Sequence, residues 1–543
     1  MVGAVLPGVG RFLVVALAWL ALGAPAAAAQ PNIVFILTDD QRWDTLRYMP
    51  TVQSELVGRG VTFANGFVTN PLCCPSRASI LTGAYSHTTG VYKNGSRGLR
   101  EFHDNETSTI ATWLDAAGYQ TAYVGKYLNG YDGSYIPPGW DRWVSPVLLR
   151  QKGGYFDYVI NVDGTLREHG ALESDYSTDV YAAEATSFID ETPTTRPLFL
   201  VFAPHGPHAP ATPAPRHASA FADLAPWRSP SYNEADVADK PDWLRSLPLL
   251  TEADAGALDA FRIDQVRTLL AVDEAVAGIV DALTRTGRLR DTFIVFTSDN
   301  GFHWGEHRLT GKRAPYEESI RVPFVVRYDA LSGPRTESPL VKNIDLAPTF
   351  AALAGVAAPG AEGQSMLPLV RGDAVAWPAR FLVENRGRPR TYCALRTMRY
   401  SFVTYATGER ELYDLPADPY QLTNVAADPA RSSTVAALRK RLARLCNPPP
   451  RRLSRQLLCT SEGTREADVL RGTKRYDILC GLRGNDRLYP RRGEDWVYAG
   501  RGKDLVESRD GHRDVIVCGR GKDVVRADLH DRVRSDCERV RRA

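Results

Sequence analysis

Long apolar runs and net charge are both scarce in this chain of 543 residues. No stretch after residue 29 reaches 18 consecutive apolar residues, which excludes a protein with several membrane-spanning helices. The 66 basic and 63 acidic residues almost cancel. A chain that is 44% hydrophobic and 24% charged is typical of globular proteins, so wholesale disorder is excluded as well. The length predicts more than one domain.

The small total charge is an average over two regions of opposite sign. Residues 447–543 carry 23 Lys/Arg and 16 Asp/Glu, a net charge of +7, whereas residues 30–446 have a net charge of −5. The basic tail favours attraction to a polyanion such as a sulfated glycan or a cell-wall polymer. A merely solvated basic face is the alternative, and we expect no nucleic-acid partner.

Lysine is rare, because only ten of the 66 basic residues are Lys and 56 are Arg. Lys126 and Lys312 each follow a glycine within a polar segment. A compact ammonium group can approach an anion as a point charge where a guanidinium fork needs more room. We interpret the two lysines as candidate anion-binding residues, and two solvated surface lysines are the alternative.

The first 29 residues have the layout of a secretory signal peptide. Arg11 precedes an apolar run over residues 12–22, and small residues follow up to Ala29. The run is too short to span a bilayer of about 30 Å. We predict cleavage near Ala29 and a secreted protein, extracellular or periplasmic, without stable membrane insertion. An uncleaved membrane anchor is the alternative.

The eight cysteines are expected to form disulfides in an exported protein, because disulfides persist outside the cytosol. The last six fall in chain order as three neighbouring pairs, which are 393/446, 459/480 and 518/537. Six cysteines allow 15 pairings, so the connectivity stays open. We do not expect the adjacent Cys73 and Cys74 to bridge each other, because the eight-membered ring would strain the peptide bond between them.

Short apolar runs alternate with helical periodicity in the first two thirds of the chain. The runs cover residues 32–37, 197–202, 293–296 and 322–326, the length of strands that are buried on both faces. The clearest helix lies at about residues 259–284, where apolar residues recur near a 3.6 period. This alternation predicts an α/β fold with a largely parallel sheet between helices. In such folds, ligands bind beyond the carboxyl ends of the strands.

Acidic residues directly follow two of these strands. Asp39 and Asp40 come after the first strand, and Asp299 and Asn300 come after the third. Three carboxylates and an amide are oxygen donors of the kind that hard cations such as Ca²⁺ or Mg²⁺ prefer. The pattern predicts a metal site, although either pair could instead cap a helix or form a turn.

The segment Cys73-Cys74-Pro75-Ser76-Arg77 is the most specific motif in the chain. By chemistry alone, Cys73 could be a nucleophile beside Arg77 or a buried structural thiol. The segment is followed by small residues and by Thr82-Gly83, and it resembles the Cys-x-Pro-Ser-Arg signature of the formylglycine-dependent sulfatases. The resemblance implies that Cys73 is the modified residue, with Cys74 at the variable position.

Further segments resemble the same family in the expected order, over about residues 31–426. They are Asp39-Asp40, Gly125-Lys126-Tyr127-Leu128-Asn129, Ala203-Pro204-His205-Gly206-Pro207-His208, Ser298-Asp299-Asn300-Gly301, Lys312, and Glu411-Leu412-Tyr413-Asp414-Leu415 with Asp418-Pro419 and Asn424. The resemblance implies an alkaline-phosphatase-like sulfatase fold over residues 30–446. A small antiparallel subdomain is expected at about residues 380–446.

The family's chemistry implies a role for each matching residue. A formylglycine-generating enzyme oxidises the cysteine to an aldehyde, whose hydrate attacks sulfur and later collapses to release sulfate. The expected ligands of the cation, Ca²⁺ rather than Mg²⁺, are Asp39, Asp40, Cys73 in its modified form, Asp299 and Asn300. The expected catalytic residues are Cys73, Arg77, Lys126, His205 and Lys312. Of these, His205 would donate a proton to the leaving alcohol or bind the sulfate.

Leu128 departs from many relatives, which have a histidine at this place. The Lys-Tyr-Leu-Asn version, with the doubled cysteine, is more similar to glucosamine-6-sulfatases and extracellular heparan endosulfatases. We expect a sulfated amino sugar or glycosaminoglycan as substrate, with aryl sulfates as the alternative. His208, His303 and His307 either line the leaving-group pocket or are ordinary polar residues at its rim.

The tail is predicted to be a separate unit after a Pro/Arg linker at residues 447–460. Aspartates recur there every eight to ten residues, each with an aliphatic residue two positions later, at Asp468, Asp477, Asp486, Asp495, Asp504, Asp514, Asp523 and Asp531. The pattern resembles hemolysin-type nonapeptide repeats, which implies a parallel β-roll over residues 461–543. Glu466, Arg475, Leu482 and Arg491 replace expected glycines, so additional Ca²⁺ in the roll and a metal-free roll are both open.

Two other functions stay open. The same superfamily fold serves phosphomonoester and phosphonate ester hydrolases, and paired lysines do not separate phosphate from sulfate. The intact Cys-x-Pro-Ser-Arg segment favours sulfate. The second alternative is an inactive, exported polyanion-binding protein, against which the presence of every expected metal-ligand type argues.

Overall fold

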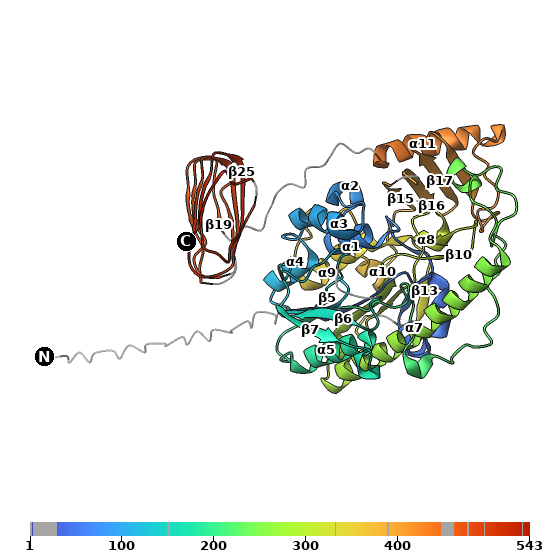
Figure 1. The fold of residues 1–543 in the computed structure, drawn as a ribbon, viewed down its shortest axis with the longest axis horizontal. Coiled ribbons are helices and arrows are strands. Elements are labelled where there is room, and N and C mark those ends of the chain that lie inside the picture. Colours follow the sequence, from blue (N-terminus) through green and yellow to red (C-terminus); the bar gives the residue numbers. More distant parts are fainter. Residues whose placement is uncertain are drawn as a thin grey trace.

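The computed structural model describes residue 3 and residues 30–542, without 149–152, 332, 388–389, 447–460, 475–476, 494 and 535. Figure 1 shows a large body of helices around a sheet, a smaller sheet next to helix α11, and a C-terminal pair of sheets. Apart from residue 3, the predicted signal peptide lies outside the described residues, as does the predicted linker. In the part of the chain that is described, no helix is both long and apolar enough to cross a bilayer.

The body is built on a ten-stranded sheet that contains all four apolar runs of the sequence. Across the sheet, the strands are β13 (Arg335–Glu337), β2 (Val61–Phe63), β12 (Phe324–Arg327), β9 (Thr292–Ser298), β1 (Asn32–Thr38), β8 (Leu198–Ala203), β4 (Gln120–Gly125), β5 (Arg142–Pro146), β6 (Tyr158–Val162) and β7 (Thr165–His169). The neighbours β9, β1, β8, β4 and β5 are all parallel. The carboxyl ends of these five strands therefore meet at one edge of the sheet.

Strand β12 does not have the parallel direction that the sequence predicted for most of the sheet. It pairs antiparallel with both β9 and β2. A continuous apolar run indicates burial on both faces, but it carries no information about strand direction. The sheet is mixed at its margins and parallel at its centre.

Helices cover both faces of the sheet because alternate residues of β1 point to opposite sides. Ile33, Phe35 and Leu37 belong to one apolar cluster, which includes residues of α1 (Cys73–Thr82), α4 (Ile110–Ala116) and α9 (Leu346–Ala354). Val34 and Ile36 belong to a second cluster with α5 (Ser177–Glu191) and α7 (Glu252–Arg285). Both faces of β1 are thus fully buried, as its apolar run predicts.

Helix α1 contains the Cys-x-Pro-Ser-Arg segment. Cys73 is its first residue, and Gly83 ends it with φ of +71°. Only glycine adopts this left-handed conformation without strain. A Cβ at Gly83 would also lie 2.9 Å from Cβ of Ala361, so the close approach of another segment excludes a side chain here.

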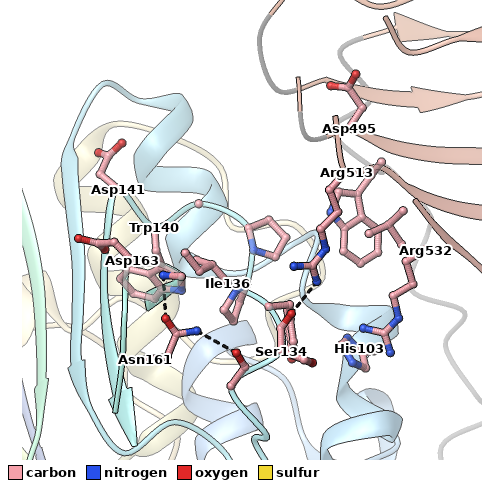
Figure 2. A pocket seen from close by; sticks show the side chains of 18 of the residues that line it. His103, Ser134, Ile136, Trp140, Asp141, Asn161, Asp163, Asp495, Arg513 and Arg532 are labelled. Atoms are coloured by element: carbon pink, nitrogen blue, oxygen red, sulfur yellow. Dashed lines mark hydrogen bonds between the residues drawn. The ribbon is translucent and has the colours of Figure 1, made fainter. Parts of the chain in front are cut away.

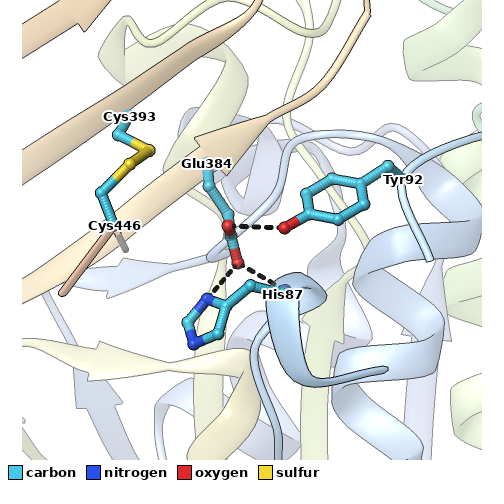
Figure 3. Close-up of a disulfide and its surroundings, with 5 residues drawn as sticks. All are labelled: His87, Tyr92, Glu384, Cys393 and Cys446. Atoms are coloured by element: carbon cyan, nitrogen blue, oxygen red, sulfur yellow. Dashed lines mark hydrogen bonds and ion pairs between the residues drawn. A yellow bond between two sulfur atoms is a disulfide. The ribbon is translucent and has the colours of Figure 1, made fainter. Parts of the chain in front are cut away.

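The expected small antiparallel subdomain follows the main sheet. It consists of β15 (Arg380–Asn385), β16 (Tyr392–Thr397), β17 (Tyr400–Tyr405), β18 (Arg410–Asp414) and helix α11 (Ser432–Cys446). A disulfide between Cys393 and Cys446 joins β16 to α11 and confirms one predicted pair (Figure 3). Glu384 of β15 accepts a hydrogen bond from the Tyr92 hydroxyl and contacts the His87 ring, which ties the subdomain to the segment after α1.

The described part of residues 461–542 forms two parallel five-stranded sheets, between which successive strands alternate. One sheet contains β19 (Ser461–Glu462), β21 (Ile478–Cys480), β23 (Trp496–Gly502), β25 (Val515–Gly521) and β27 (Arg532–Val533). The other contains β20 (Val469–Arg471), β22 (Arg487–Tyr489), β24 (Leu505–Ser508), β26 (Val524–Ala527) and β28 (Arg539–Arg542). The aliphatic residues lie opposite one another, as Leu479 and Val497 do in the first sheet and Leu488 and Val506 in the second.

The remaining cysteines and the repeated aspartates stabilise this C-terminal unit. Cys518 and Cys537 form the predicted disulfide. Cys480 is also disulfide-bonded, and its expected partner, Cys459, lies outside the described residues. The aspartates form a ladder in which Oδ1 of one residue accepts from the backbone N–H of an aspartate one turn earlier, as Oδ1 of Asp486 does from Asp468. The aspartate side chains therefore join neighbouring turns of this unit by hydrogen bonds.

Candidate active site

The predicted oxygen donors come together at the carboxyl edge of the sheet. Because β1 and β9 are parallel and in register, Asp39-Asp40 and Asp299-Asn300 are neighbours. The Asp40 backbone N–H donates to Oδ1 of Asp299 at 3.1 Å, and the Asn300 side-chain amide donates to Oδ1 of Asp40 at 2.7 Å. Asp40 has φ of +70°, in the left-handed region that aspartate tolerates better than most residues. The two strand ends thus build one acidic cluster.

Cys73 faces this cluster from the first turn of α1 and is fully buried. Its Sγ lies 3.6 Å from Oδ1 of Asp39, and Nζ of Lys312 donates to it at 2.9 Å. Burial raises the pKa of the Cys73 thiol to about 11, although Lys126 and Lys312 oppose the shift.

Cys74 occupies a different environment. Its Sγ donates to Oδ1 of Asn129 at 3.5 Å, and its backbone N–H donates to Oδ1 of Asn94 at 2.9 Å. Neither Cys73 nor Cys74 is in a disulfide. Of the two adjacent cysteines, Cys73 is the one that contacts the acidic cluster.

Arg77 lies one turn further along α1 and is buried with the cluster. Its Nε donates to Oδ2 of Asp299 at 2.8 Å, and its Nη1 donates to the Lys126 carbonyl at 2.5 Å. Its Nη2 has no hydrogen-bond partner in the described residues and lies 4.0 Å from Oδ2 of Asp39. An unsatisfied buried N–H group is energetically unfavourable, so Nη2 is available to an anionic ligand.

Lys126 follows β4, and Lys312 follows the short strand β11 (Thr310–Gly311). Lys126 forms an ion pair with Asp39, and Lys312 forms one with Asp40. Burial alone would lower the pKa of both lysines, but the facing carboxylates raise it above the usual value. Burial alone would raise the pKa of Asp39, yet Lys126 and its neighbours hold that pKa well below the usual range. These groups are therefore charged.

His205 and His208 lie on the loop after β8. The His205 ring is buried, with Nδ1 4.0 Å from Oδ2 of Asp39, and neither ring nitrogen has a hydrogen-bond partner among the described residues. Burial and the nearby His208 lower the pKa of His205 well below its usual value, so the ring is neutral. His208 has Nε2 3.8 Å from Oδ2 of Asp40, which places it beside the acidic pair and not at a distant rim.

Three other residues singled out in the sequence have different surroundings. The His303 ring contacts the Gly311 carbonyl at 3.1 Å, and the His307 ring contacts Oε2 of Glu234 at 2.7 Å. Leu128 is fully buried in the apolar cluster of the α1 face. Position 128, where the family resemblance implied a histidine, is a core position in this chain.

Supporting residues outside the predicted set hold the cluster in place. The Gln41 backbone N–H donates to Oγ of Ser298 at 2.9 Å, and the Ser298 hydroxyl donates to the Asn300 carbonyl at 2.9 Å. The Tyr123 hydroxyl donates to the Lys126 carbonyl at 2.7 Å. Ser298 belongs to the Ser-Asp-Asn-Gly segment and could have been found from it. Tyr123 stands in a strand, where no local pattern separates it from a core residue.

The donor set at this edge fits a hard divalent cation. Donor atoms of Asp39, Asp40, Cys73 and His208 lie within 4.8 Å of one another, and Oδ1 of Asn300 is buried without a hydrogen-bond partner in the described part of the chain. Oxygen ligands suit Ca²⁺ or Mg²⁺, whereas a thiol does not, so an oxygen at position 73 would leave the His208 ring nitrogen as the one donor of this group that is not an oxygen. Both Asp299 oxygens already accept hydrogen bonds, and its role as a ligand stays a prediction.

A parallel sheet with an acidic carboxyl edge and a covering helix that begins at a buried cysteine defines an alkaline-phosphatase-like hydrolase fold. The sulfatase family model matches residues 31–356. A second model, that of the C-terminal region of N-sulphoglucosamine sulphohydrolase, matches residues 305–447. The chain belongs to the sulfatase family.

Individual relatives agree with this assignment. The chain is 37% identical over 380 residues to the extracellular sulfatase SULF-1 homolog of Drosophila melanogaster. This alignment covers 67% of this chain and 34% of that protein. It is 34% identical over 461 residues to the N-acetylglucosamine-6-sulfatase of Homo sapiens, and the alignment covers 74% of this chain and 82% of that protein. The chain thus spans about one third of the length of the fly relative.

A solved structure supports the fold independently. A protein in complex with its substrate D-glucosamine-2-N,6-O-disulfate has a TM-score of 0.68 to this chain at 24% sequence identity. The superposition covers 78% of this chain and 99% of that one. At this level of identity, the likeness concerns the fold.

Proposed function

We propose that the protein is an exported sulfatase that hydrolyses sulfate esters through a formylglycine formed from Cys73. The observation that carries the proposal is the convergence of three cationic side chains, Arg77, Lys126 and Lys312, on a buried cysteine and an acidic pair. Such a site suits an anionic ester. The predicted signal peptide and the extracellular relatives support export.

The charges in the site favour an anionic ester once a divalent cation is bound. The three carboxylates of Asp39, Asp40 and Asp299 face three cationic groups, so the protein's own charges roughly cancel. A divalent cation then leaves an excess of about two positive charges in a buried site, where water screens poorly. A sulfate monoester carries one negative charge and is attracted to this excess, as is a phosphate monoester with up to two, so the Cys-x-Pro-Ser-Arg segment and not the charge balance favours sulfate.

Each residue has a task in the proposed reaction. Bound Ca²⁺, held by the acidic pair and Asn300, would lower the pKa of the hydrated formylglycine and polarise the sulfate group. Arg77, through Nη2, and Lys126 bind sulfate oxygens and orient the sulfur for attack. Lys312 hydrogen-bonds the side chain of residue 73 and holds the attacking oxygen in place. His205, as a neutral imidazole, hydrogen-bonds the ester oxygen that leaves with the alcohol.

We propose a sulfated sugar as the substrate, of the glucosamine-6-sulfate type, with aryl sulfates as the second class. The name of the human relative, N-acetylglucosamine-6-sulfatase, supports this choice. The Lys-Tyr-Leu-Asn segment at residues 126–129 points in the same direction.

We also propose that residues 461–543 are a β-roll of hemolysin-type repeats. The division of the chain into a signal peptide at 1–29, a sulfatase domain at 30–446 and a linker at 447–460 goes with this proposal. Two parallel sheets with alternating strands and stacked aliphatic residues support it. The net charge of +7 over residues 447–543 supports a role in holding a sulfated polyanion.

Mass spectrometry of the peptide that contains Cys73 tests the proposal. In protein from the native host, we expect the mass of an aldehyde side chain in place of the thiol. Formation of the aldehyde also implies an oxidising partner, a formylglycine-generating enzyme. An unmodified thiol in active protein would overturn the proposed chemistry.

Two matched variants and a substrate panel complete the test. Cys73→Ala is expected to abolish turnover, whereas Cys74→Ala is expected to retain most of it, because Cys74 contacts Asn129 instead of the acidic cluster. The panel contains glucosamine-6-sulfate, galactose-6-sulfate, an aryl sulfate and a phosphonate monoester. Faster hydrolysis of the phosphonate than of every sulfate would favour the alternative hydrolase of the same fold.

A further inference from the structure

Two arginines beside Lys312 have no acidic partner. Arg313 follows Lys312 directly in the chain, and Arg390, just before β16, donates through Nη1 to the Lys312 carbonyl at 3.0 Å. Both arginine side chains are partly buried. Within the described residues neither of them forms an ion pair, whereas Lys312 itself pairs with Asp40. The two guanidinium groups are therefore positive charges without a counterion at the edge of the active site.

Hydrogen-bond donors around these arginines lack acceptors. Nε of Arg313 is buried without a hydrogen-bond partner among the described residues, and so is the hydroxyl of Tyr392, a residue that is only 2% exposed. The Arg390 guanidinium lies over the Trp243 ring at 4.6 Å, and Nε1 of Trp243 also has no acceptor in that part of the chain. Buried polar groups of native proteins normally have partners. The three unpaired donors therefore favour a ligand that supplies acceptor oxygens.

The charges of this group agree with an anionic ligand. Burial lowers the pKa of Arg390 from its usual value, and the neighbouring Arg313 lowers it further, so the two guanidinium groups repel each other. Burial raises the pKa of Tyr392, and both arginines oppose this shift because they lie near its hydroxyl. Glu411 also acts on Tyr392, but both of its oxygens already accept from other tyrosine hydroxyls. An anion between the two arginines would relieve their repulsion.

The backbone holds the Arg313 side chain in place. Arg313 has φ of +80°, a left-handed conformation that residues other than glycine rarely adopt. Such a conformation persists only where the surrounding structure fixes it, and it is frequent at ligand-binding sites. Gly387 gives the guanidinium its space, because a Cβ at this position would overlap Nη2 of Arg313.

A cavity in another part of the molecule shows arginines that do have acidic neighbours. Arg513, Arg532 and Arg534 line a cavity of about 470 Å³ between the sulfatase body and the C-terminal unit (Figure 2). Aspartates at positions 115, 141, 163 and 495 line the same cavity. Arg513 donates to the Ser134 carbonyl at 2.8 Å, and Arg534 pairs with Asp104 at 3.2 Å. Acidic residues thus accompany the arginines of this cavity, unlike those beside Lys312.

We propose that Arg313 and Arg390, together with the Tyr392 hydroxyl, bind a second anionic group of the substrate, next to the sulfate that is removed. The substrate class is then a sulfated glycan that carries another sulfate or a carboxylate near the scissile ester, and not a singly charged sugar. Lys312 connects the two places, because its side chain contacts Cys73 and its carbonyl accepts from Arg390. This assignment rests on the proposed function, which defines the scissile sulfate.

Isothermal titration calorimetry on full-length Cys73→Ala protein with Ca²⁺ tests the assignment, because this variant is expected to bind ligands without turnover. The singly charged probe is N-acetylglucosamine-6-sulfate. The doubly charged probes are glucosamine-2-N,6-O-disulfate and a disaccharide of 6-sulfated N-acetylglucosamine with a uronic acid. We expect at least one doubly charged probe to bind roughly tenfold or more tightly than the singly charged one, and the tighter probe identifies the second group as sulfate or carboxylate. Equal affinities for all three probes would overturn the proposal.

Two variants in this background locate the second group. Arg313→Gln is expected to make the affinities for singly and doubly charged probes nearly equal, since glutamine lacks the charge and the fork of donors. Gly387→Ala should have the same effect without removal of a charge, because its Cβ displaces the guanidinium. Circular dichroism checks that each variant is folded. A wild-type preference for the doubly charged probe in both variants would overturn the proposal.

Arg380→Gln is the matched control for charge. Arg380 is exposed at the start of β15, whereas Gly387 and Arg390 follow the end of that strand. We expect this variant to keep the preference for the doubly charged probe. An equal loss in Arg380→Gln and Arg313→Gln would mean that general positive charge attracts the second group, which would also overturn the proposal.

Failure of this assignment and failure of the proposed function have different readouts. Mass spectrometry of the Cys73 peptide reports the chemistry, whereas the affinities are measured in a protein that cannot perform it. An unmodified thiol in active wild-type protein, with a preference that depends on Arg313, would remove the formylglycine mechanism and support the second anion site. Formylglycine at position 73 with equal affinities for all probes would support the mechanism and overturn the second anion site.

Discussion

The Arg77 guanidinium and the Asp299 carboxylate form an ion pair with 2.8 Å between Nε and Oδ2, and both side chains are at most 1% exposed. The pair fixes the plane of the guanidinium, so that Nη1 reaches the Lys126 carbonyl and Nη2 faces Asp39. One residue of the signature segment thereby connects helix α1, strand β9 and the lysine loop. The acidic cluster and the proposed anion-binding groups are joined by these hydrogen bonds and ion pairs into one unit.

Arg77→Lys is expected to lower kcat/KM by roughly 100-fold or more, because one transition-state donor is lost. A lysine can pair with Asp299, but it cannot also reach the Lys126 carbonyl and present Nη2. Steady-state kinetics on an aryl sulfate measures the effect. Arg97→Lys, on the exposed side of the neighbouring helix, is the control and should retain wild-type rates. Unchanged kinetics in Arg77→Lys would contradict the anion-binding role.

Chelation is expected to abolish turnover, because the acidic pair and Asn300 have a donor set that fits a hard cation. Exhaustive treatment with EDTA followed by titration with Ca²⁺ should restore the rate. Asp39→Asn should raise the Ca²⁺ concentration needed for half-restoration by roughly tenfold or more, since one anionic ligand is removed. Full activity after complete removal of divalent cations, checked by elemental analysis, would rule out the cation site.

Glu318 provides a prediction about pH that is independent of the active-site cation. Burial, with a further contribution from Glu306, raises the pKa of Glu318 to about 7. A raised folded-state pKa stabilises the fold fully below the unfolded-state pKa, and this stabilisation is lost as the pH rises through about 7. Glu318→Gln mimics the protonated form and should gain about 3 kcal/mol of unfolding free energy relative to the wild type at pH 8.

Urea denaturation at pH 5 and pH 8 measures this difference. The variant and the wild type should be close at pH 5, and the variant should be the more stable protein at pH 8. Glu317→Gln is the matched control, since Glu317 pairs with Arg396 and should lose stability on substitution. Equal pH dependence in the wild type and Glu318→Gln would refute the shifted pKa.

Leu128→His introduces the residue type that the family resemblance implied at this position, but it is expected to impair this protein. Leu128 is fully buried among apolar side chains, so an imidazole there would lack a partner and lose packing, at about 2–4 kcal/mol. Thermal unfolding is the measurement, and Leu128→Met is the control, with a cost below about 1.5 kcal/mol. A variant as stable as the wild type and more active would show that the position belongs to the site.

The sequence predicts the acidic edge well because the signal is local. An apolar run followed by two acidic residues indicates a strand end, and parallel neighbours bring such ends together. The Asp39-Asp40 and Asp299-Asn300 pairs meet for this reason. The Cys393–Cys446 and Cys518–Cys537 pairings were open in the sequence, and the nearest-neighbour choice is confirmed for both.

Other features depend on distant parts of the chain and could not be predicted. The antiparallel direction of β12 is one, because an apolar run has the same composition in both directions. The early start of α7 is another, since residues 252–258 are mostly exposed and carry little apolar periodicity. A capping box of Thr251 and Asp254 marks that start and was detectable in principle. The proximity of His208 to Asp40 depends on the path of a loop.

The complete burial of helix α1 has a consequence for when the proposed oxidation of Cys73 can take place. Every residue from Cys73 to Thr82 is buried. The active site of another enzyme therefore has no access to this segment once the chain has folded. Under the proposed chemistry, oxidation of Cys73 has to come before folding, on a segment that is still extended. Each molecule is then committed to be active or inactive during its synthesis. A folded pool that escaped oxidation would be permanently inactive, and cellular control over activity would lie in the supply of the oxidising partner.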